Sequence, residues 1–299
     1  MGLGSRQRGR AQGPAPTRSG PAATTTELLG ALRHDRLAIA QQPIVSLADG
    51  RLSGTESLVR WAHPRLGLLL PGDFLHLAET VGAMPALDGF VLRSACRRLA
   101  ASPFVVPTSV NVSRSTLLQR GFVEQVLRTL RDFGVAGDRL LLELSEQLTL
   151  DDLELVRDEL LQLRRAGVQV ALDDLGSGAT SLQHVRMLEP AFVKVDRSLV
   201  SGVDSAPHRL AAVARVVDLA RSTGAAVTAE GVERTSEAEL LLDLGCERGQ
   251  GWLFGRPVLQ PATDRITHHG DDQRPQERPG AQHRREPLVG GGVPAREAR

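Results

Sequence analysis

Acidic and amide side chains recur along the chain, each at the end of a short apolar run. They are Glu56, Asn111, Glu143, Asp173, Asp174, Asp196, Glu230 and Gln250, with Lys194 among them. Carboxylate and amide oxygens are the ligands that hard divalent cations such as Mg²⁺ and Mn²⁺ prefer. A lysine within such a set suits a charged phosphate substrate or an activated water. These residue types therefore predict metal-assisted chemistry in one oxygen-rich pocket.

Two adjacent aspartates are the strongest single signal. Asp173 and Asp174 follow an apolar run, and neighbouring carboxylates repel each other unless cations neutralise them. A carboxylate shared by two cations about 3.5 to 4 Å apart gives an arrangement suited to displacement at phosphorus. The alternative is that one aspartate caps the following helix, which accounts for only one of the pair.

Two other pairs have structural alternatives. Glu56 and Arg60 share one face of an expected strand, so they could form a salt bridge instead of a functional site. Lys194 and Asp196 alternate in the same way. A lysine inside a barrel needs a partner, and Asp196 could supply it.

Two further glutamates lie three residues beyond strand-end glutamates. They are Glu146 and Glu233, and either could be a helix-start acid favoured by the helix dipole. The histidines show no spacing typical of a zinc site, and no Ser-His-Asp or Cys-His order is evident. Hydrolysis by a protein nucleophile is therefore disfavoured.

Short apolar runs alternate with amphipathic stretches, which is typical of β/α units. The expected strands are residues 37–46, 53–61, 105–111, 140–143, 168–173, 192–196, 226–230 and 249–254. The expected helices are residues 73–79, 86–100, 122–133, 151–166, 181–188, 209–223 and 236–244. All strand ends of a parallel barrel open onto one face, so the scattered candidates converge. The turn at residues 48–51 leaves no room for a helix, so we expect a modified TIM (βα)8 barrel with an antiparallel first strand.

Length and composition favour one barrel in a reducing cytoplasm. A chain of 299 residues with 41% apolar content can bury a core of this size. Residues 1–25 and 263–299 lack the apolar content to offset ordering entropy, so we expect two disordered tails. Two cysteines, no secretory segment and no apolar run of about 20 residues predict a cytoplasmic protein without a membrane partner. A net acidic body and few aromatic residues predict no nucleic-acid polymer as partner.

Eight short motifs occur in a defined order along the chain. They are Gln42-Pro-Ile-Val, Glu56-Ser-Leu-Val-Arg-Trp, Asn111-Val-Ser, Glu143-Leu-Ser-Glu, Asp173-Asp-Leu-Gly-Ser-Gly, Lys194-Val-Asp-Arg, Ala229-Glu-Gly-Val-Glu and Gln250-Gly-Trp. Together they resemble the EAL domain family of cyclic-di-GMP phosphodiesterases, over residues 26–262. The resemblance implies a modified TIM barrel that hydrolyses cyclic-di-GMP to linear pGpG with two Mg²⁺ or Mn²⁺ ions, which lowers the level of this second messenger.

The resemblance also implies a role for each matched residue. The implied metal ligands are Glu56, Asn111, Glu143 and Asp173 for one ion, and Asp173, Asp174 and Glu230 for the other. The implied catalytic residues are Lys194, Asp196, Glu230 and Glu233, with Lys194 orienting the attacking hydroxide. The implied substrate-binding residues are Gln42, Arg60 and Gln250. Glu146 is expected to brace the loop after Asp174.

Three positions depart from the family pattern. Ser57 replaces the alanine of Glu-Ala-Leu and leaves the charged ligand in place. Leu175 and Ala179 stand where the family usually has Phe and Tyr, in a loop that couples the metal site to dimerisation. The alternative function is therefore a catalytically weak cyclic-di-GMP receptor that signals through a partner, and a homodimer is the candidate oligomer. A third alternative, another barrel enzyme with carboxylate-held Mg²⁺ such as a lyase, predicts no affinity for the dinucleotide.

Overall fold

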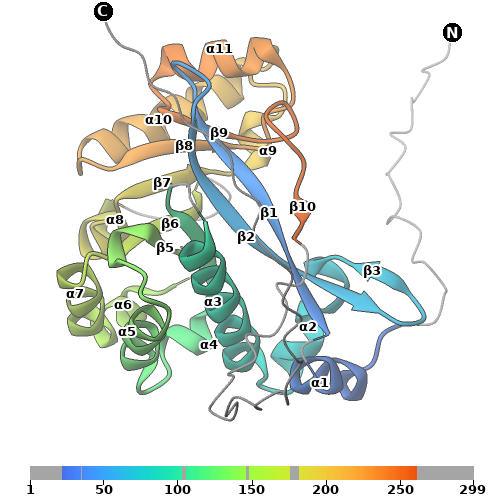
Figure 1. Ribbon diagram of the computed structural model, residues 1–299. Helices are drawn as coiled ribbons and strands as arrows, with labels where there is room; N and C mark the ends of the chain where they lie inside the picture. Colours follow the sequence, from blue (N-terminus) through green and yellow to red (C-terminus); the bar gives the residue numbers. More distant parts are fainter. Residues whose placement is uncertain (1–21, 35, 103–105, 146–147, 176–181, 261–299) are drawn as a thin grey trace, which may run out of the picture. The chain divides into compact units, whose positions relative to one another are not determined.

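The computed structural model describes residues 22–34, 36–102, 106–145, 148–175 and 182–260. Eight strands form a closed barrel (Figure 1). They are β1 (Leu37–Ser46), β2 (Leu52–His63), β4 (Thr108–Val112), β5 (Leu140–Ser145), β6 (Gln169–Leu175), β7 (Phe192–Val195), β8 (Ala226–Glu230) and β9 (Arg248–Gln250). Two short strands, β3 (Gly67–Leu69) and β10 (Val258–Leu259), pair with β2 and β1 at the ends of the sheet.

The first strand closes the barrel with the opposite direction from its neighbours. β1 is antiparallel to both β2 and β9, whereas every neighbouring pair from β2 through β4 to β9 is parallel. A tight turn between β1 and β2 makes them a hairpin, because parallel strands would need a long crossover. The expected modified TIM barrel with an antiparallel first strand is confirmed.

Helices surround the strands on the outside of the barrel (Figure 1). The longer ones are α1 (Thr25–Arg33), α2 (Pro71–Thr80), α3 (Met84–Ala101), α5 (Phe122–Phe133), α7 (Arg157–Arg165), α10 (Pro207–Arg221) and α11 (Thr235–Leu244). The shorter ones are α4 (Arg114–Leu117), α6 (Leu150–Leu155), α8 (Leu182–Leu188) and α9 (Arg197–Val200). Alternate strand residues such as Val110, Leu142 and Val193 face these helices and form the main apolar core.

The interior of the barrel is built in layers. Leu141, Ala171 and Phe192 form a separate small apolar cluster, and each lies two residues before a site position on its strand. Since side chains alternate along a strand, Glu143, Asp173 and Lys194 point to the same side as these residues. The apolar layer therefore lies directly beneath the charged groups in the barrel interior.

The helix at the start of the described chain, α1, was not expected from the sequence. Thr24 accepts the backbone N–H of Glu27, and the Glu27 carboxylate accepts the N–H of Thr24, which is a capping box. Leu28 and Ala31 then bury one face of the helix. The expected tails lie outside the described residues apart from residues 22–25, so their disorder stays a prediction.

A divided helix and a shortened strand are the largest differences from the expected elements. The single helix expected at residues 151–166 is divided into α6 and α7, because Val156 leaves the helical region (φ −107°, ψ 11°) while its side chain stays buried. The strand expected at residues 249–254 ends at Gln250, because the chain turns there and the N–H of Phe254 bonds to the oxygen of Gly251.

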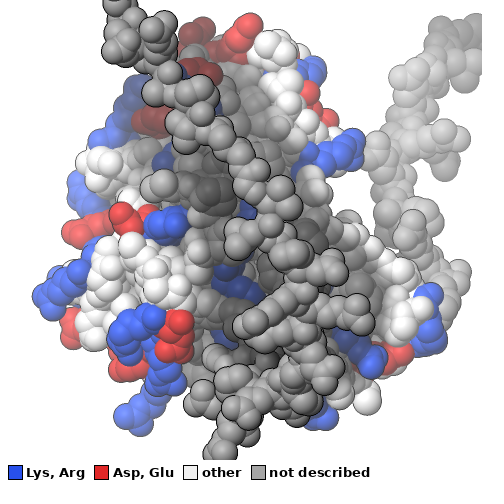
Figure 2. Space-filling model, viewed as in Figure 1, with Lys and Arg blue, Asp and Glu red and all other residues white. Residues whose placement is uncertain are grey.

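Charged side chains of both signs lie close together on the face that Figure 2 shows. The described residues of this face therefore present no continuous patch of one sign. No helix in the described ranges is both long and apolar enough to cross a membrane.

Candidate metal and phosphate site

Lys194 occupies the centre of the barrel mouth. Its Nζ lies 2.5 Å from Oε1 of Glu230, 2.8 Å from Oε2 of Glu143, 3.1 Å from Oδ1 of Asp173 and 3.8 Å from Oε2 of Glu56. These carboxylates come from β8, β5, β6 and β2, so four strands deliver their acids to one ammonium. The alternative of a salt bridge between Lys194 and Asp196 is not found among the ion pairs of the described residues.

Lys194, Glu56 and Glu143 are buried, whereas Asp173 and Glu230 are partly exposed, and burial alters the pKa values of the group. Burial alone would lower the pKa of Lys194, but the carboxylates of Glu143, Glu230, Glu56 and Asp173 outweigh it and raise the pKa well above its ordinary value. Burial raises the pKa of Glu143 well above its usual range, and the charge of Glu56 adds to this. Burial likewise raises the pKa of Glu230 to about 8, against the opposing effect of Lys194.

Glu56 is held by two amides. Nδ2 of Asn111 donates to its Oε1 at 2.8 Å, and Nε2 of Gln250 donates to its Oε2 at 2.6 Å. Although burial opposes ionisation, Lys194 and these hydrogen bonds lower the pKa of Glu56. Gln250 also donates to Oε1 of Gln42 at 3.1 Å. The register explains this grouping, since Gln42 pairs with Glu56 across β1 and β2.

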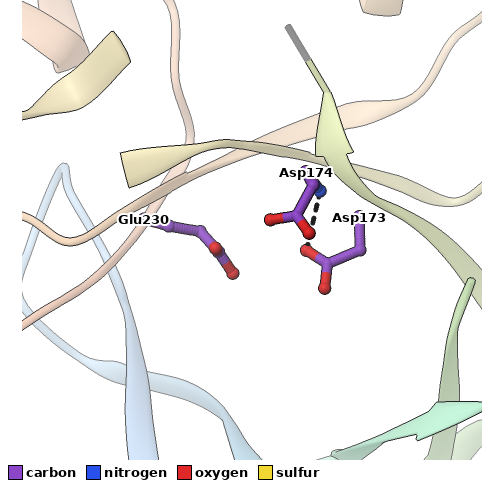
Figure 3. A group of neighbouring side chains, drawn as sticks. All are labelled: Asp173, Asp174 and Glu230. Atoms are coloured by element: carbon purple, nitrogen blue, oxygen red, sulfur yellow. Dashed lines mark hydrogen bonds between the residues drawn. The ribbon is translucent and has the colours of Figure 1, made fainter. Parts of the chain in front are cut away.

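Asp173, Asp174 and Glu230 form a second group at the same mouth (Figure 3). One carboxylate oxygen from each lies within 4.8 Å of the others. The N–H of Asp174 donates to Oδ1 of Asp173 at 3.0 Å, and Asp174 has φ 58°. Aspartate tolerates this left-handed conformation better than most residues, and it places two consecutive carboxylates beside Glu230.

A cavity of about 280 Å³ opens above these groups. It is lined by Gln42, Glu56, Leu58, Asp173, Lys194, Arg197, Glu230, Gly231, Glu233, Gln250, Gly251 and Trp252. Arg197 and Trp252 have no separate expected role, although both lie in the family-like motifs of the sequence. Trp252 is 47% exposed, and the guanidinium groups of Arg256 and Arg197 lie 4.0 and 5.3 Å from its ring.

Two of the expected catalytic residues, Asp196 and Glu233, are not among the carboxylates that contact Lys194. Asp196 caps α9, because its Oδ1 accepts the N–H of Ser198 at 2.9 Å. Glu233 lines the cavity and accepts a hydrogen bond from Nη2 of Arg197 at 2.6 Å. Their roles in the reaction stay predictions.

Arg60 lies on the same face of β2 as Glu56, beyond the cavity lining. Its Nη1 donates to the carbonyl of Val59 at 2.8 Å, and burial lowers its pKa while Glu56 opposes that shift. Among the described ion pairs, Glu56 meets Lys194 and not Arg60. Glu146, expected to brace the neighbouring loop, lies outside the described residues, as does Ala179.

The donors at the barrel mouth fit divalent cations. Four carboxylates surround one ammonium and a fifth lies beside them, so negative charge is left for further cations to neutralise: these acids are Glu56, Glu143, Asp173 and Glu230, with Asp174 as the fifth. Oε1 of Glu143 is buried and has no hydrogen-bond partner among the described residues. A buried acceptor without a partner is unfavourable, and a cation would satisfy it.

The fold and site define an α/β-barrel protein with an oxygen-ligand site at the carboxyl ends of its strands. More specifically, the chain belongs to the EAL domain family, whose model matches residues 25–257.

Similar proteins include both named and uncharacterized members. The cyclic di-GMP phosphodiesterase NbdA of Pseudomonas aeruginosa is 36% identical over 236 residues, which are 78% of this chain and 30% of NbdA. An uncharacterized protein of Mycobacterium tuberculosis is 38% identical over 246 residues, or 78% of this chain and 79% of that protein. The structure of the PaMucR phosphodiesterase in complex with c-di-GMP has a TM-score of 0.74 at 33% identity, covering 79% of this chain and 97% of that one. The chain thus spans less than a third of the length of NbdA, and 37% of another mycobacterial relative.

Proposed function

We propose that this protein is a phosphodiesterase that hydrolyses cyclic-di-GMP to linear pGpG with two Mg²⁺ or Mn²⁺ ions. The observation that carries the proposal is the convergence of four carboxylates on Lys194 beside one cavity, with a fifth, that of Asp174, next to Asp173 and Glu230. Family membership and the name of the relative NbdA support the choice of substrate.

Two groups of ligands serve the two ions. Glu56, Asn111, Glu143 and Asp173 would hold one, and Asp173, Asp174 and Glu230 the other. Bound divalent ions supply Lewis-acid activation of water and stabilise the departing oxygen. Asp173 belongs to both sets, which suits its place between Lys194 and Asp174.

The remaining polar residues bind and orient the substrate. Lys194 provides a permanent positive charge, because its pKa is raised. Gln250 holds both Glu56 and Gln42 and so joins the metal ligands to the cavity wall. Arg60, further along β2, provides a cation for the phosphate. The exposed ring of Trp252 offers an aromatic surface for a base, as in other sites that bind nucleotides by stacking.

Product formation tests the proposal directly. The purified protein is incubated with cyclic-di-GMP and Mg²⁺ or Mn²⁺, and pGpG is quantified by chromatography. Glu56→Gln keeps the shape of the side chain but removes a ligand charge, so turnover should fall by at least about a hundredfold. Glu247→Gln is the control, because the side chain of Glu247 lies at the opposite end of β8, where its Oε2 accepts the N–H of Val227, and it does not line the cavity.

The receptor alternative gives a different result in the same assay. A receptor binds cyclic-di-GMP tightly in the presence of Mn²⁺ and releases no pGpG. Leu175 is the described residue that motivates this alternative, and its side chain is 2% exposed in the core beside Val195. A wild-type protein that binds without turnover would contradict the enzymatic proposal, and a protein without affinity would contradict both.

A further inference from the structure

Glu237, in the first turn of α11, receives four hydrogen bonds at one buried carboxylate. Oε1 accepts the N–H of Gly202 at 2.8 Å and Nη2 of Arg234 at 2.7 Å. Oε2 accepts the N–H of Glu233 at 3.0 Å and of Arg234 at 3.1 Å. Glu237 is 2% exposed, so these donors replace the water that an ionised acid would otherwise require.

This arrangement exceeds what a helix cap needs. A capping box needs only the bond from the N–H of Arg234, which precedes α11. The bonds from Gly202 and Glu233 reach two different loops, one after α9 and one after β8. Although burial opposes ionisation, the backbone N–H groups of Gly202 and Glu233 lower the pKa of Glu237. The carboxylate therefore joins two loops at the mouth of the barrel.

The loop after β8 carries groups of the candidate site. It begins at Glu230 and continues to Glu233, which lines the cavity. On its other side, the N–H of Val232 donates to the oxygen of Gln250 at 3.0 Å, and the oxygen of Val232 accepts the N–H of Leu253 at 3.1 Å. The loop is thus held at Val232 by the end of β9 and at Glu233 by Glu237.

We propose that Glu237 is a positioning residue that holds Glu230 and Glu233 in register with the rest of the acidic site. The inference rests on the proposed function, because it assigns Glu230 to a metal ion. Glu237 does not line the cavity; it acts through the backbone N–H of Glu233 in the loop. Without its charge, the bonds from the N–H groups of Gly202, Glu233 and Arg234 weaken, and the position of Glu230 relative to Asp173 and Asp174 becomes less defined.

The test compares Glu237→Gln with Glu247→Gln. Both changes remove one charge from an acid that accepts backbone N–H groups next to β8, but Glu247 acts at the end of the strand away from the cavity. Titration calorimetry with Mn²⁺ on the metal-free proteins is the main readout. Partners that orient metal ligands typically contribute about ten- to a hundredfold in affinity, so we expect Glu237→Gln to bind Mn²⁺ about tenfold more weakly than wild type. Glu247→Gln should match the wild type.

Equal Mn²⁺ affinity in the two variants would overturn the positioning role. Steady-state kinetics then add a second readout, in which Glu237→Gln lowers kcat more than it raises KM for cyclic-di-GMP. If wild type fails to cleave cyclic-di-GMP, the proposed function fails, whereas the Mn²⁺ comparison still decides the role of Glu237. Should Glu237→Gln not fold, Glu237→Asp and Glu247→Asp keep the charge but shorten its reach, and equal Mn²⁺ affinity in that pair overturns the proposal.

Discussion

Lys194 and Glu230 make the closest contact of the site, with Nζ and Oε1 separated by 2.5 Å. Lys194 is also the only lysine in the sequence, which otherwise uses arginine. Lysine is a compact charge with three donors, whereas the planar guanidinium of arginine is larger and binds in a fork. A pocket between four carboxylates therefore suits lysine.

We predict that the ammonium of Lys194 titrates well above the ordinary value of 10.5 in the metal-free protein. Labelling with ¹⁵N-lysine gives one side-chain signal, because the sequence has one lysine. Since the folded pKa is raised, the contribution of Lys194 to stability is fully present below 10.5 and is lost as pH rises through the folded pKa. Titration at or below 10.5 would contradict the carboxylate contacts. The pKa of Lys194 in the denatured protein provides the reference value.

We predict that binding of Mn²⁺ near pH 7 releases protons. The pKa of Glu230 is raised to about 8 in the metal-free protein, so this acid is mostly protonated at pH 7 and must ionise to bind a metal. Mn²⁺ affinity should therefore increase as pH rises towards 8. Calorimetry in two buffers with different ionisation enthalpies measures the protons released. Glu230→Gln should release fewer protons on binding Mn²⁺. A binding heat of the wild type that does not depend on the buffer would refute the prediction.

We predict that Gly251→Ala impairs the site. A Cβ at Gly251 would lie 2.1 Å from the oxygen and 2.3 Å from the nitrogen of Val232, and a backbone cannot move aside like a flexible side chain. Overpacking of this kind typically costs about 1–3 kcal/mol, and here it separates Gln250 from the loop that carries Glu230. We expect a similar loss in the free energy of unfolding and at least a tenfold loss of turnover.

Gly72→Ala is the control for that change. A Cβ at Gly72 meets nothing within 4 Å, and this residue lies in α2. Urea unfolding and the pGpG assay are applied to both variants. Equal behaviour of the two variants would show that the close approach of Gly251 to Val232 is unimportant.

We predict that Asp152→Asn destabilises the fold more than Asp151→Asn does. Asp152 accepts two hydrogen bonds from Arg114, at 2.7 and 2.6 Å, and one from the N–H of Thr149 at 2.9 Å. The guanidinium of Arg114 lowers the pKa of Asp152, and the Thr149 bonds add to this. The neighbouring Asp151 is exposed. From bonds of this kind we expect the free energy of unfolding to fall by about 1–2 kcal/mol for Asp152→Asn and by a few tenths of a kcal/mol for Asp151→Asn.

The sign of the pH dependence follows from the lowered pKa. The contribution of Asp152 is present above its unfolded pKa of about 3.9 and is lost as pH falls below that value. The stability difference between wild type and Asp152→Asn should therefore shrink below pH 4. Urea unfolding at pH 7 and pH 3 measures it, and a difference independent of pH would mean that the charge of Asp152 is not responsible.

Much of the fold could be predicted from local patterns. Apolar runs ending in acids marked the strands of the barrel, and the short turn after Ser46 marked the antiparallel hairpin. The capping box of Thr24 and Glu27 is also a local signal, and it would have revealed α1. The early end of β9 was not predictable in this way, because the backbone of Gln250 and of Leu253 bonds to Val232, which lies in the loop after β8.

The sequence alone determined which side chains are available and that strand ends carry them, since residue type and strand alternation are local properties. Tertiary structure decided which of them meet. The register across β4 and β5 sets Asn111 beside Glu143, and barrel closure brings Gln250 to Glu56. Packing of the loop after α9 adds the N–H of Gly202 to the donors of Glu237. These outcomes depend on distances between residues far apart in the chain, which only the packed barrel defines.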